Sequence, residues 1–190
     1  MPQRDPAPLL EAARREWGGK SDLWVFGYAS LIWRPDFEVA EHRPAKVHGW
    51  HRALKMWSKV YRGTPETPGL VCALLSGGSC HGVVLRVPRK EASEVLQQIW
   101  QREMFSGIYD PRWLNCATSH GTVTALAFTL SRKNSNFAGD LHHEHYRRIF
   151  STAQGRYGSS LDYARQTLAS LRQHGIEDKA LRKLLRHADD

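Results

Sequence analysis

The order of strand-like and helix-like segments along the chain is the strongest constraint on its fold. Short apolar runs that are typical of strands dominate the first half, whereas amphipathic helical periodicity dominates the last third. This order excludes the regular alternation of strands and helices that builds a doubly wound parallel sheet. The sequence therefore predicts an α+β fold, in which a curled mixed sheet has helices outside it.

Short apolar runs bounded by turn residues predict the individual strands. The run LWVFGY at 23–28 follows Ser21-Asp22 and is too short for a helix, so it predicts a buried strand. The turn sequences RGTPETPG and LSGGS separate later runs. Further strands are predicted at 45–50, 52–57, 69–75, 80–87, 113–118 and 122–130, and helices at 89–105, 140–153, 160–173 and 177–187.

Length and composition predict one globular domain. The chain has 190 residues, with 41% hydrophobic and 24% charged residues, which excludes wholesale disorder. We expect residues 1–20, which contain prolines and then a helix-like stretch, to form an N-terminal extension to a domain at 21–190. No window approaches the roughly 18 apolar residues of a membrane-spanning helix, and the N-terminus lacks a signal-peptide core. We therefore expect a cytoplasmic protein with no membrane partner.

The three cysteines, Cys72, Cys80 and Cys116, are odd in number and widely spaced. No CxxC pair occurs among them, which argues against a disulfide framework and against a zinc ribbon. We expect reduced thiols with structural roles.

The net charge of +8, from 27 Lys and Arg against 19 Asp and Glu, indicates anionic partners of some kind. The segment 43–62 carries six basic residues, no acid and several aromatic residues, a combination that suits single-stranded nucleic acid. The alternation in RALKMW is instead typical of a two-faced strand whose charges lie in water. We expect no nucleic-acid partner, and keep a nucleic-acid-binding module as the less favoured alternative.

One acidic residue, Glu103, lies on the apolar stripe of the helix that begins near Lys90. It stands four residues after Ile99 and three after Trp100, whereas Arg102 falls on a solvated face. Burial of a carboxyl group raises its pKa and suits it to proton transfer near neutral pH. From periodicity alone, a helix-end glutamate that pairs with an arginine or a backbone amide is the favoured interpretation.

The strand exit FGYASLIW at 26–33 is a second candidate site. Gly27, Ala29 and Ser30 are small residues placed where a buried strand ends, so a ligand could approach the backbone and accept hydrogen bonds from its N–H groups. An ordinary tight turn would give the same pattern.

Signals for a metal or a nucleophilic centre fail on spacing. His143-Glu144-His145 begins like HExxH, but Arg147 stands in place of the second ligand. The run GGSCHG at 77–82 lacks the last glycine of GxSxG. Cys80 and His81 are neighbours on a predicted strand and point to opposite faces. The sequence predicts no metal site, and no nucleotide-binding motif is present.

Five ordered blocks occur along the chain between about Leu23 and Leu185. They are VFGYASLIW, VHGWHRALKMWS with YRGTPETPGLV, GGSCHGVVLRV, WQREMFSGIY and GRYGSSLDYARQTL. Together they resemble the glutathione-degrading branch of the ChaC family of γ-glutamylcyclotransferases. The resemblance implies a small mixed β-barrel flanked by helices, and an enzyme that cleaves glutathione to 5-oxoproline and Cys-Gly without a cofactor.

The resemblance also assigns site residues. It matches the family's catalytic glutamate to Glu103, as general acid and base. The family's Gly-Tyr-Gly-Ser-Leu loop corresponds to 27–31 here, and its backbone would hold the γ-glutamyl group. The residues implied for substrate binding are Val25, Phe26, Gly27, Tyr28, Ala29, Ser30, Leu31, Arg62, Tyr109 and Tyr163.

Two positions depart from the family pattern. Ala29 replaces the usual glycine, and Ser160 stands where relatives often have asparagine. If the loop needs a positive φ at residue 29, the alanine would cost on the order of 1 kcal/mol or more. Because this would alter or narrow the pocket, a cyclotransferase for another γ-glutamyl amine or amide is the nearest alternative function. The oligomeric state is left open.

Overall fold

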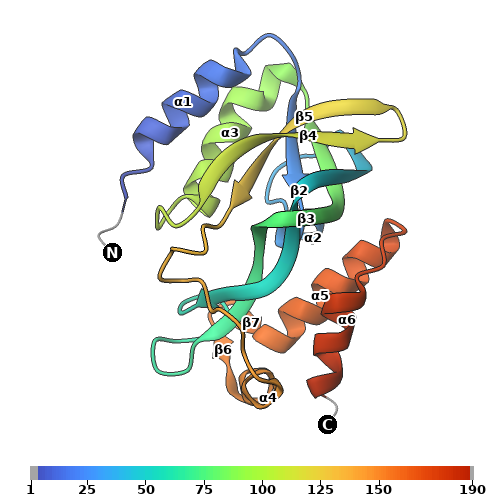
Figure 1. Cartoon of the computed structure of the whole chain (residues 1–190). Helices are drawn as coiled ribbons and strands as arrows, with labels where there is room; N and C mark the ends of the chain where they lie inside the picture. Colours follow the sequence, from blue (N-terminus) through green and yellow to red (C-terminus); the bar gives the residue numbers. More distant parts are fainter. Residues whose placement is uncertain (1–3, 189–190) are drawn as a thin grey trace.

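A closed five-stranded barrel forms the centre of the computed structural model, which describes residues 4–188 (Figure 1). The strand order is β1-β3-β2-β4-β5, and a parallel pairing of β1 with β5, with Val25 opposite Leu126, closes the barrel. The other neighbouring pairs are antiparallel. The predicted mixed β-barrel is confirmed, with strands β1 (Leu23–Gly27), β2 (Glu41–Ser58), β3 (Gly69–Val87), β4 (Asp110–Thr118) and β5 (Gly121–Thr129).

Helices cover the barrel on two sides (Figure 1). Helix α1 (Ala7–Trp17) lies beside α3 (Arg89–Glu103), and its Leu10 and Ala13 are buried in the core. The helix-like stretch expected within residues 1–20 thus packs on the barrel domain. The remaining elements are α2 (Ser30–Trp33), α4 (His143–Thr152), a hairpin of β6 (Gln154–Gly155) and β7 (Gly158–Ser159), α5 (Ser160–Gln173), α6 (Lys179–Leu185) and the 3-10 turn η1 (Arg186–Ala188).

Two groups of buried apolar side chains hold these layers together. One group joins α1 and α3 to the barrel and includes the fully buried Leu96, Ile99 and Phe128. The other joins α4, α5 and α6 to the barrel and includes Phe26 and Leu74. Each such side chain contributes roughly 1.5–3 kcal/mol on burial, so the position of α3 relative to the barrel is firmly fixed.

Strands β2 and β3 are much longer than predicted. The two strands expected at 45–50 and 52–57 form one strand, β2, whose register shifts at two bulges. The strands expected at 69–75 and 80–87 likewise form one strand, β3. The turn predicted at LSGGS is wrong, because Gly77 and Gly78, at φ 95° and 73°, bend β3 while its pairing with β2 resumes on the other side.

The expectation that the charges of RALKMW lie in water is wrong for Arg52. Its side chain is 6% exposed and pairs with Asp178, the N-cap residue of α6, at 2.6 Å. Two other basic residues of the 43–62 segment, Arg43 and Lys55, also form ion pairs with acids of this chain. Half of the six Lys and Arg residues of the segment are therefore engaged in intramolecular ion pairs.

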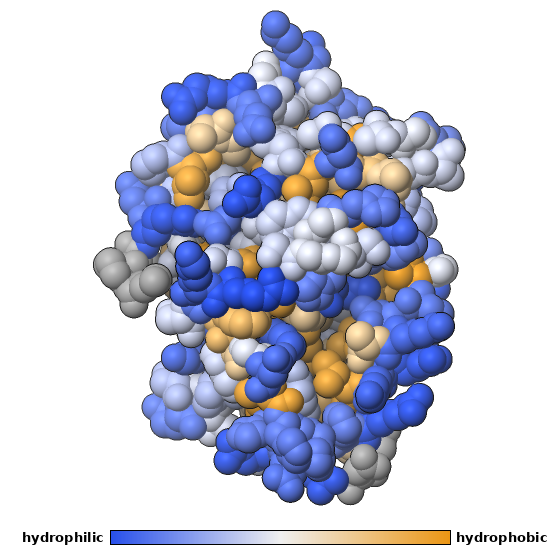
Figure 2. All heavy atoms as spheres, in the orientation of Figure 1, coloured by the Kyte–Doolittle hydropathy of each residue, from blue (hydrophilic) through white to orange (hydrophobic). Residues whose placement is uncertain are grey.

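One face of the molecule is drawn in Figure 2. The face in Figure 2 is mostly hydrophilic, with apolar residues gathered in separate patches. Across residues 4–188 no helix combines the length and the apolar character needed to cross a membrane. Cys72, Cys80 and Cys116 are free, buried thiols, as their number and spacing predicted.

Candidate active site

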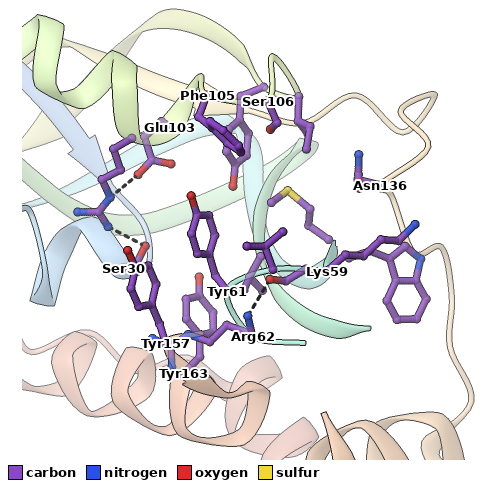
Figure 3. A pocket seen from close by; sticks show the side chains of 18 of the residues that line it. Ser30, Lys59, Tyr61, Arg62, Glu103, Phe105, Ser106, Asn136, Tyr157 and Tyr163 are labelled. Atoms are coloured by element: carbon purple, nitrogen blue, oxygen red, sulfur yellow. Dashed lines mark hydrogen bonds and ion pairs between the residues drawn. The ribbon is translucent and has the colours of Figure 1, made fainter. Parts of the chain in front are cut away.

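A cavity of about 400 Å³ opens where α2, the C-terminal end of α3 and the segment after β2 meet. Glu103 and Phe105 lie on one side of it, and Arg62 and Tyr163 lie on the opposite side (Figure 3). The cavity is lined by Ser30, Trp33, Arg34, Asp36, Met56, Trp57, Ser58, Lys59, Val60, Tyr61, Arg62, Val71, Arg102, Glu103, Phe105, Ser106, Ile108, Tyr109, Asn136, Tyr157 and Tyr163.

A smaller recess of about 20 Å³ adjoins this cavity. Its volume is enough for about one water molecule. Ser30, Glu103, Tyr109 and Tyr163 line both spaces, so the recess lies against the cavity wall that carries Glu103. The recess is lined by Tyr28, Ala29, Ser30, Leu31, Cys72, Glu103, Tyr109, Phe128 and Tyr163.

Glu103 is the last residue of α3 and reaches both spaces. The apolar stripe of the helix packs on the barrel and carries the carboxyl group with it, so that the side chain is only 14% exposed. Burial raises the pKa of Glu103 above its ordinary value of 4.5, while the neighbouring Arg102 acts in the opposite direction. The carboxyl group is thus suited to accept and return a proton near neutral pH.

Arg102 connects Glu103 with the loop after β1. Its guanidinium group lies 3.0 Å from the Glu103 carboxylate and donates to Ser30 Oγ at 3.2 Å and to Asp36 at 2.9 Å. It also donates to the carbonyl of Arg34. The expectation of a solvated Arg102 is wrong, because α2 and the segment after it cover this face of the helix. Helical periodicity could not show that contact, since it comes from residues far away in sequence.

Three tyrosine rings surround the recess. The Tyr28 hydroxyl donates to the carbonyl of Phe128 at 3.0 Å, and the Tyr163 hydroxyl accepts from the Cys72 N–H at 3.2 Å. Burial raises the pKa of Tyr28, Tyr109 and Tyr163 well above 10. The phenols therefore stay protonated at neutral pH. Because the Tyr28 proton is donated to Phe128, Tyr109 and Tyr163 are the phenols that can act as hydrogen-bond donors around Glu103.

The loop from Tyr28 to Leu31 presents backbone N–H groups beside the recess. Within residues 4–188, no hydrogen bond has the N–H of Ala29, Ser30 or Leu31 as its donor. Such N–H groups next to a cavity can stabilise a carboxylate or a developing oxyanion. Ala29 has a φ of −153°, so its backbone needs no left-handed conformation and the alanine carries no such strain.

Arg62 is held at the opposite side of the cavity by the turn between β2 and β3. Its backbone N–H donates to Ser58 Oγ at 3.0 Å, and the buried Ser160 hydroxyl contacts its carbonyl at 3.2 Å. The guanidinium carbon lies 5.4 Å from the Tyr163 ring centre. Arg62 lines the cavity, and no ion pair found among residues 4–188 uses its guanidinium group, so it can receive a carboxylate from a ligand.

The structure gathers most of the residues implied for the site, but not all of them. Tyr28, Ala29, Ser30, Leu31, Arg62, Glu103, Tyr109 and Tyr163 each line the cavity, the recess or both. Val25 and Phe26 are fully buried in the core and Gly27 pairs with Val83, and these three residues of β1 line neither space.

An aromatic rim around the cavity mouth had no signal in the sequence. Tyr61 and Tyr157 stack with their ring centres 5.0 Å apart, and both are partly exposed. Phe105 is 60% exposed on the facing side (Figure 3). The rim combines residues from three separate segments, so only the folded chain brings it together.

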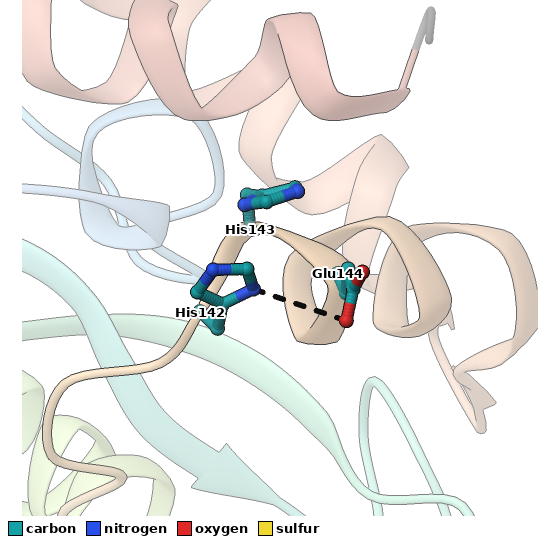
Figure 4. A group of neighbouring side chains, drawn as sticks. All are labelled: His142, His143 and Glu144. Carbon is teal, nitrogen blue, oxygen red and sulfur yellow. Dashed lines mark ion pairs between the residues drawn. The ribbon is translucent and has the colours of Figure 1, made fainter.

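His142, His143 and Glu144 form a group of possible metal ligands away from this cavity (Figure 4). Their ligand atoms lie within 4.8 Å of one another, and all three residues are exposed. Figure 4 shows His142, which precedes α4 as its N-cap residue, facing Glu144. His142 Nδ1 lies 3.9 Å from a carboxylate oxygen of Glu144. The absence of a bound metal remains a prediction.

The comparisons with known proteins agree with one another. The family model described as ChaC-like protein matches residues 23–190. The glutathione-specific γ-glutamylcyclotransferase of Escherichia coli K12 is 32% identical over 164 residues, which cover 86% of this chain and 71% of that protein. Glutathione-specific γ-glutamylcyclotransferase 1 of Rattus norvegicus is 31% identical, covering 85% of this chain and 75% of that protein.

A solved structure shares the fold. The crystal structure of a glutathione-specific γ-glutamyl cyclotransferase from yeast superimposes with a TM-score of 0.81 at 22% identity. The match covers 90% of this chain and 96% of the yeast chain. The two chains therefore build the same helix-flanked barrel.

Proposed function

The chain belongs to the ChaC-like protein family, and from that membership we propose that it is a γ-glutamylcyclotransferase specific for glutathione. The observation that carries the proposal is the position of Glu103, a largely buried carboxyl group that lines the same recess as the loop Tyr28–Leu31. The cavity of about 400 Å³ in front of it gives room for the rest of a tripeptide. Its proposed partner is thus a small molecule.

The proposed reaction needs little more than orientation and one proton-transfer group. The α-amine of the γ-glutamyl group can attack its own γ-carbonyl carbon, and intramolecular attack of this kind can contribute roughly 7–11 kcal/mol when the geometry is right. At neutral pH this amine is mostly protonated, so a base must first remove a proton. We propose Glu103 for this role, because burial raises the basicity of its carboxylate.

The bond changes balance with Glu103 as both base and acid. Glu103 takes one proton from the ammonium group, and the free amine attacks the γ-carbonyl carbon to form the new C–N bond of the five-membered ring. The C–N bond to cysteine then breaks as Glu103 returns that proton to the departing nitrogen. The ring nitrogen gives its second proton to solvent, and the released amine takes one up from solvent. The loop N–H groups would stabilise the negative oxygen in between, and the products are 5-oxoproline and Cys-Gly.

A direct assay tests this proposal. The purified chain is incubated with glutathione, and 5-oxoproline and Cys-Gly are measured, with a one-to-one ratio expected. The α-linked isomer of glutathione is the control, since its amine cannot release Cys-Gly by this cyclisation. Release of 5-oxoproline from another γ-glutamyl amine, but not from glutathione, would overturn the substrate assignment. No product from any γ-glutamyl compound would overturn the function.

The pH dependence of turnover follows from the buried carboxyl group. Glu103 must be deprotonated to act as base, and burial raises its pKa above 4.5, so kcat/KM should fall as pH decreases through that raised value. Replacing Arg102 with Met removes the opposing cation and should move the acidic limb to higher pH. Arg102→Lys, which keeps the charge, is the control. A limb that stays in place or moves to lower pH in Arg102→Met contradicts this assignment.

Arg62 is proposed to bind a substrate carboxylate. Replacing Arg62 with Met should raise KM for glutathione about 10-fold or more, because a charged hydrogen bond to a carboxylate contributes roughly 1.5–3 kcal/mol. kcat should change much less, since Arg62 lies across the cavity from Glu103. Arg165→Met, at an exposed position on α5, is the control. An unchanged KM in Arg62→Met would exclude this role.

The proposed compartment is the cytoplasm. Reducing compartments keep thiols free, as Cys72, Cys80 and Cys116 are here.

The binding of nucleic acid through the 43–62 segment is the remaining alternative function. Three basic residues of this segment, Arg43, Arg52 and Lys55, are already paired with acids of this chain.

A further inference from the structure

Arg52 lies outside the cavity that holds Glu103, and its buried guanidinium group makes several polar contacts. Its guanidinium group lies at 2.6 Å from the Asp178 carboxylate and donates to the carbonyls of Tyr28, at 2.9 Å, and His81, at 3.0 Å. The side chain belongs to β2, and its partners belong to the loop after β1, to β3 and to the N-cap of α6. One side chain thus joins four parts of the fold.

The contact with the Tyr28 carbonyl sets the orientation of one peptide group. A trans peptide is planar, with its N–H opposite its carbonyl, and the described residues contain no cis peptide. When the Tyr28 carbonyl points to Arg52, the N–H of Ala29 must point the other way. Arg52 lines neither the recess nor the Glu103 cavity, whereas Ala29 lines the recess.

We propose that Arg52 is a positioning residue for the cyclotransferase reaction, which holds the Tyr28–Ala29 peptide so that the Ala29 N–H faces the recess beside Glu103. This inference rests on the proposed function. The Tyr28 hydroxyl, bonded to Phe128, anchors the side chain of the same residue. Arg52 therefore fixes the backbone carbonyl of Tyr28, whereas Phe128 fixes its side chain.

Asp178 has a different role in this arrangement. It neutralises Arg52 and caps α6 by accepting from the Leu181 N–H at 2.8 Å, but it lines neither of the spaces at Glu103. Removing either partner breaks the same ion pair, and only the loss of Arg52 also removes the donor to the Tyr28 carbonyl. The pair thus provides its own matched control.

The test compares Arg52→Met with Asp178→Asn in the glutathione assay. Both variants should unfold at lower temperature than the parent protein, and both are assayed where circular dichroism shows them folded. Arg52→Met should lose at least 10-fold in kcat with KM changed less than threefold, because a misplaced oxyanion donor weakens transition-state binding. Asp178→Asn should keep kcat within threefold.

Several outcomes would overturn the proposal. One is a kcat of Arg52→Met within threefold of the parent value. Another is a loss of kcat in Asp178→Asn equal to that in Arg52→Met, which would show that the ion pair has only a structural role. If Arg52→Met does not fold, Arg52→Lys replaces it, because one ammonium group cannot reproduce the separate guanidinium contacts. A kcat loss of at least threefold is expected there, and no loss overturns the proposal. If the parent protein releases no 5-oxoproline, the proposed function itself has failed.

Discussion

Replacing Glu103 with Gln should lower kcat for 5-oxoproline formation by about 10²- to 10⁴-fold, the range that general acid–base catalysis contributes. The amide keeps the size of the side chain, and its oxygen can still accept from Arg102, which lies 3.0 Å from the carboxylate. It cannot take a proton from the substrate amine at neutral pH. KM should change little, since Glu103 is proposed to transfer a proton and not to bind the substrate.

A second glutamate on the same helix supplies the control. Glu94 is exposed on α3, and Glu94→Gln should retain the kcat and KM of the parent protein. Both variants are assayed by chromatographic detection of 5-oxoproline, with unfolding curves to verify the fold. Retention of more than a tenth of the parent kcat in Glu103→Gln would rule out Glu103 as the base.

Replacing Gly69 with Ala should destabilise the fold by about 3 kcal/mol or more, at or beyond the upper end for overpacking. Gly69 begins β3, where a Cβ would lie 2.0 Å from the carbonyl oxygen of Arg62 and 2.3 Å from the Ser160 hydroxyl. Neither atom can yield cheaply, because one is backbone and the other is a fully buried hydroxyl bonded to the Leu70 N–H. Urea unfolding measures the loss.

A glycine in open space is the matched control for Gly69. Gly121 has a φ of 98°, and a Cβ there would meet no atom within 4 Å. Gly121→Ala should therefore cost only the strain of a left-handed alanine, about 1–2 kcal/mol. An equal or smaller loss in Gly69→Ala would show that the backbone around Arg62 adapts. A rise in KM is also expected in Gly69→Ala, since the turn that carries Arg62 must shift.

Local patterns in the sequence predict much of the fold and part of the site. The order of segments indicated a helix-flanked mixed sheet, and the helix at 160–173 was predicted with its observed ends. The burial of Glu103 could be predicted because its signal, an apolar stripe that continues onto an acid, lies within one helix, whereas its catalytic role was implied only by the family resemblance. Short-range periodicity is sufficient for such features.

The remaining features depend on contacts that periodicity does not encode. The unbroken course of β3 through Gly77 and Gly78 follows from its pairing with β2, because an isolated SGGS segment has the composition of a turn. Arg52 looked solvated since its partner, Asp178, is 126 residues away. Arg102 was placed on the solvent face because nothing on its own helix indicates Asp36 and Ser30.

The closure of the barrel by β1 and β5 has a consequence for the order in which the protein folds. The loop beside Glu103 is anchored by the Tyr28 hydroxyl on the Phe128 carbonyl, a contact between residues 100 positions apart. Contacts across long stretches of chain form late, because a large loop must be closed first. The β2–β3 hairpin and α3 can thus form while the loop N–H groups still lack their final orientation. We therefore expect the loop to reach its catalytic orientation only when both the Arg52 contact and the closure of β1 on β5 are in place.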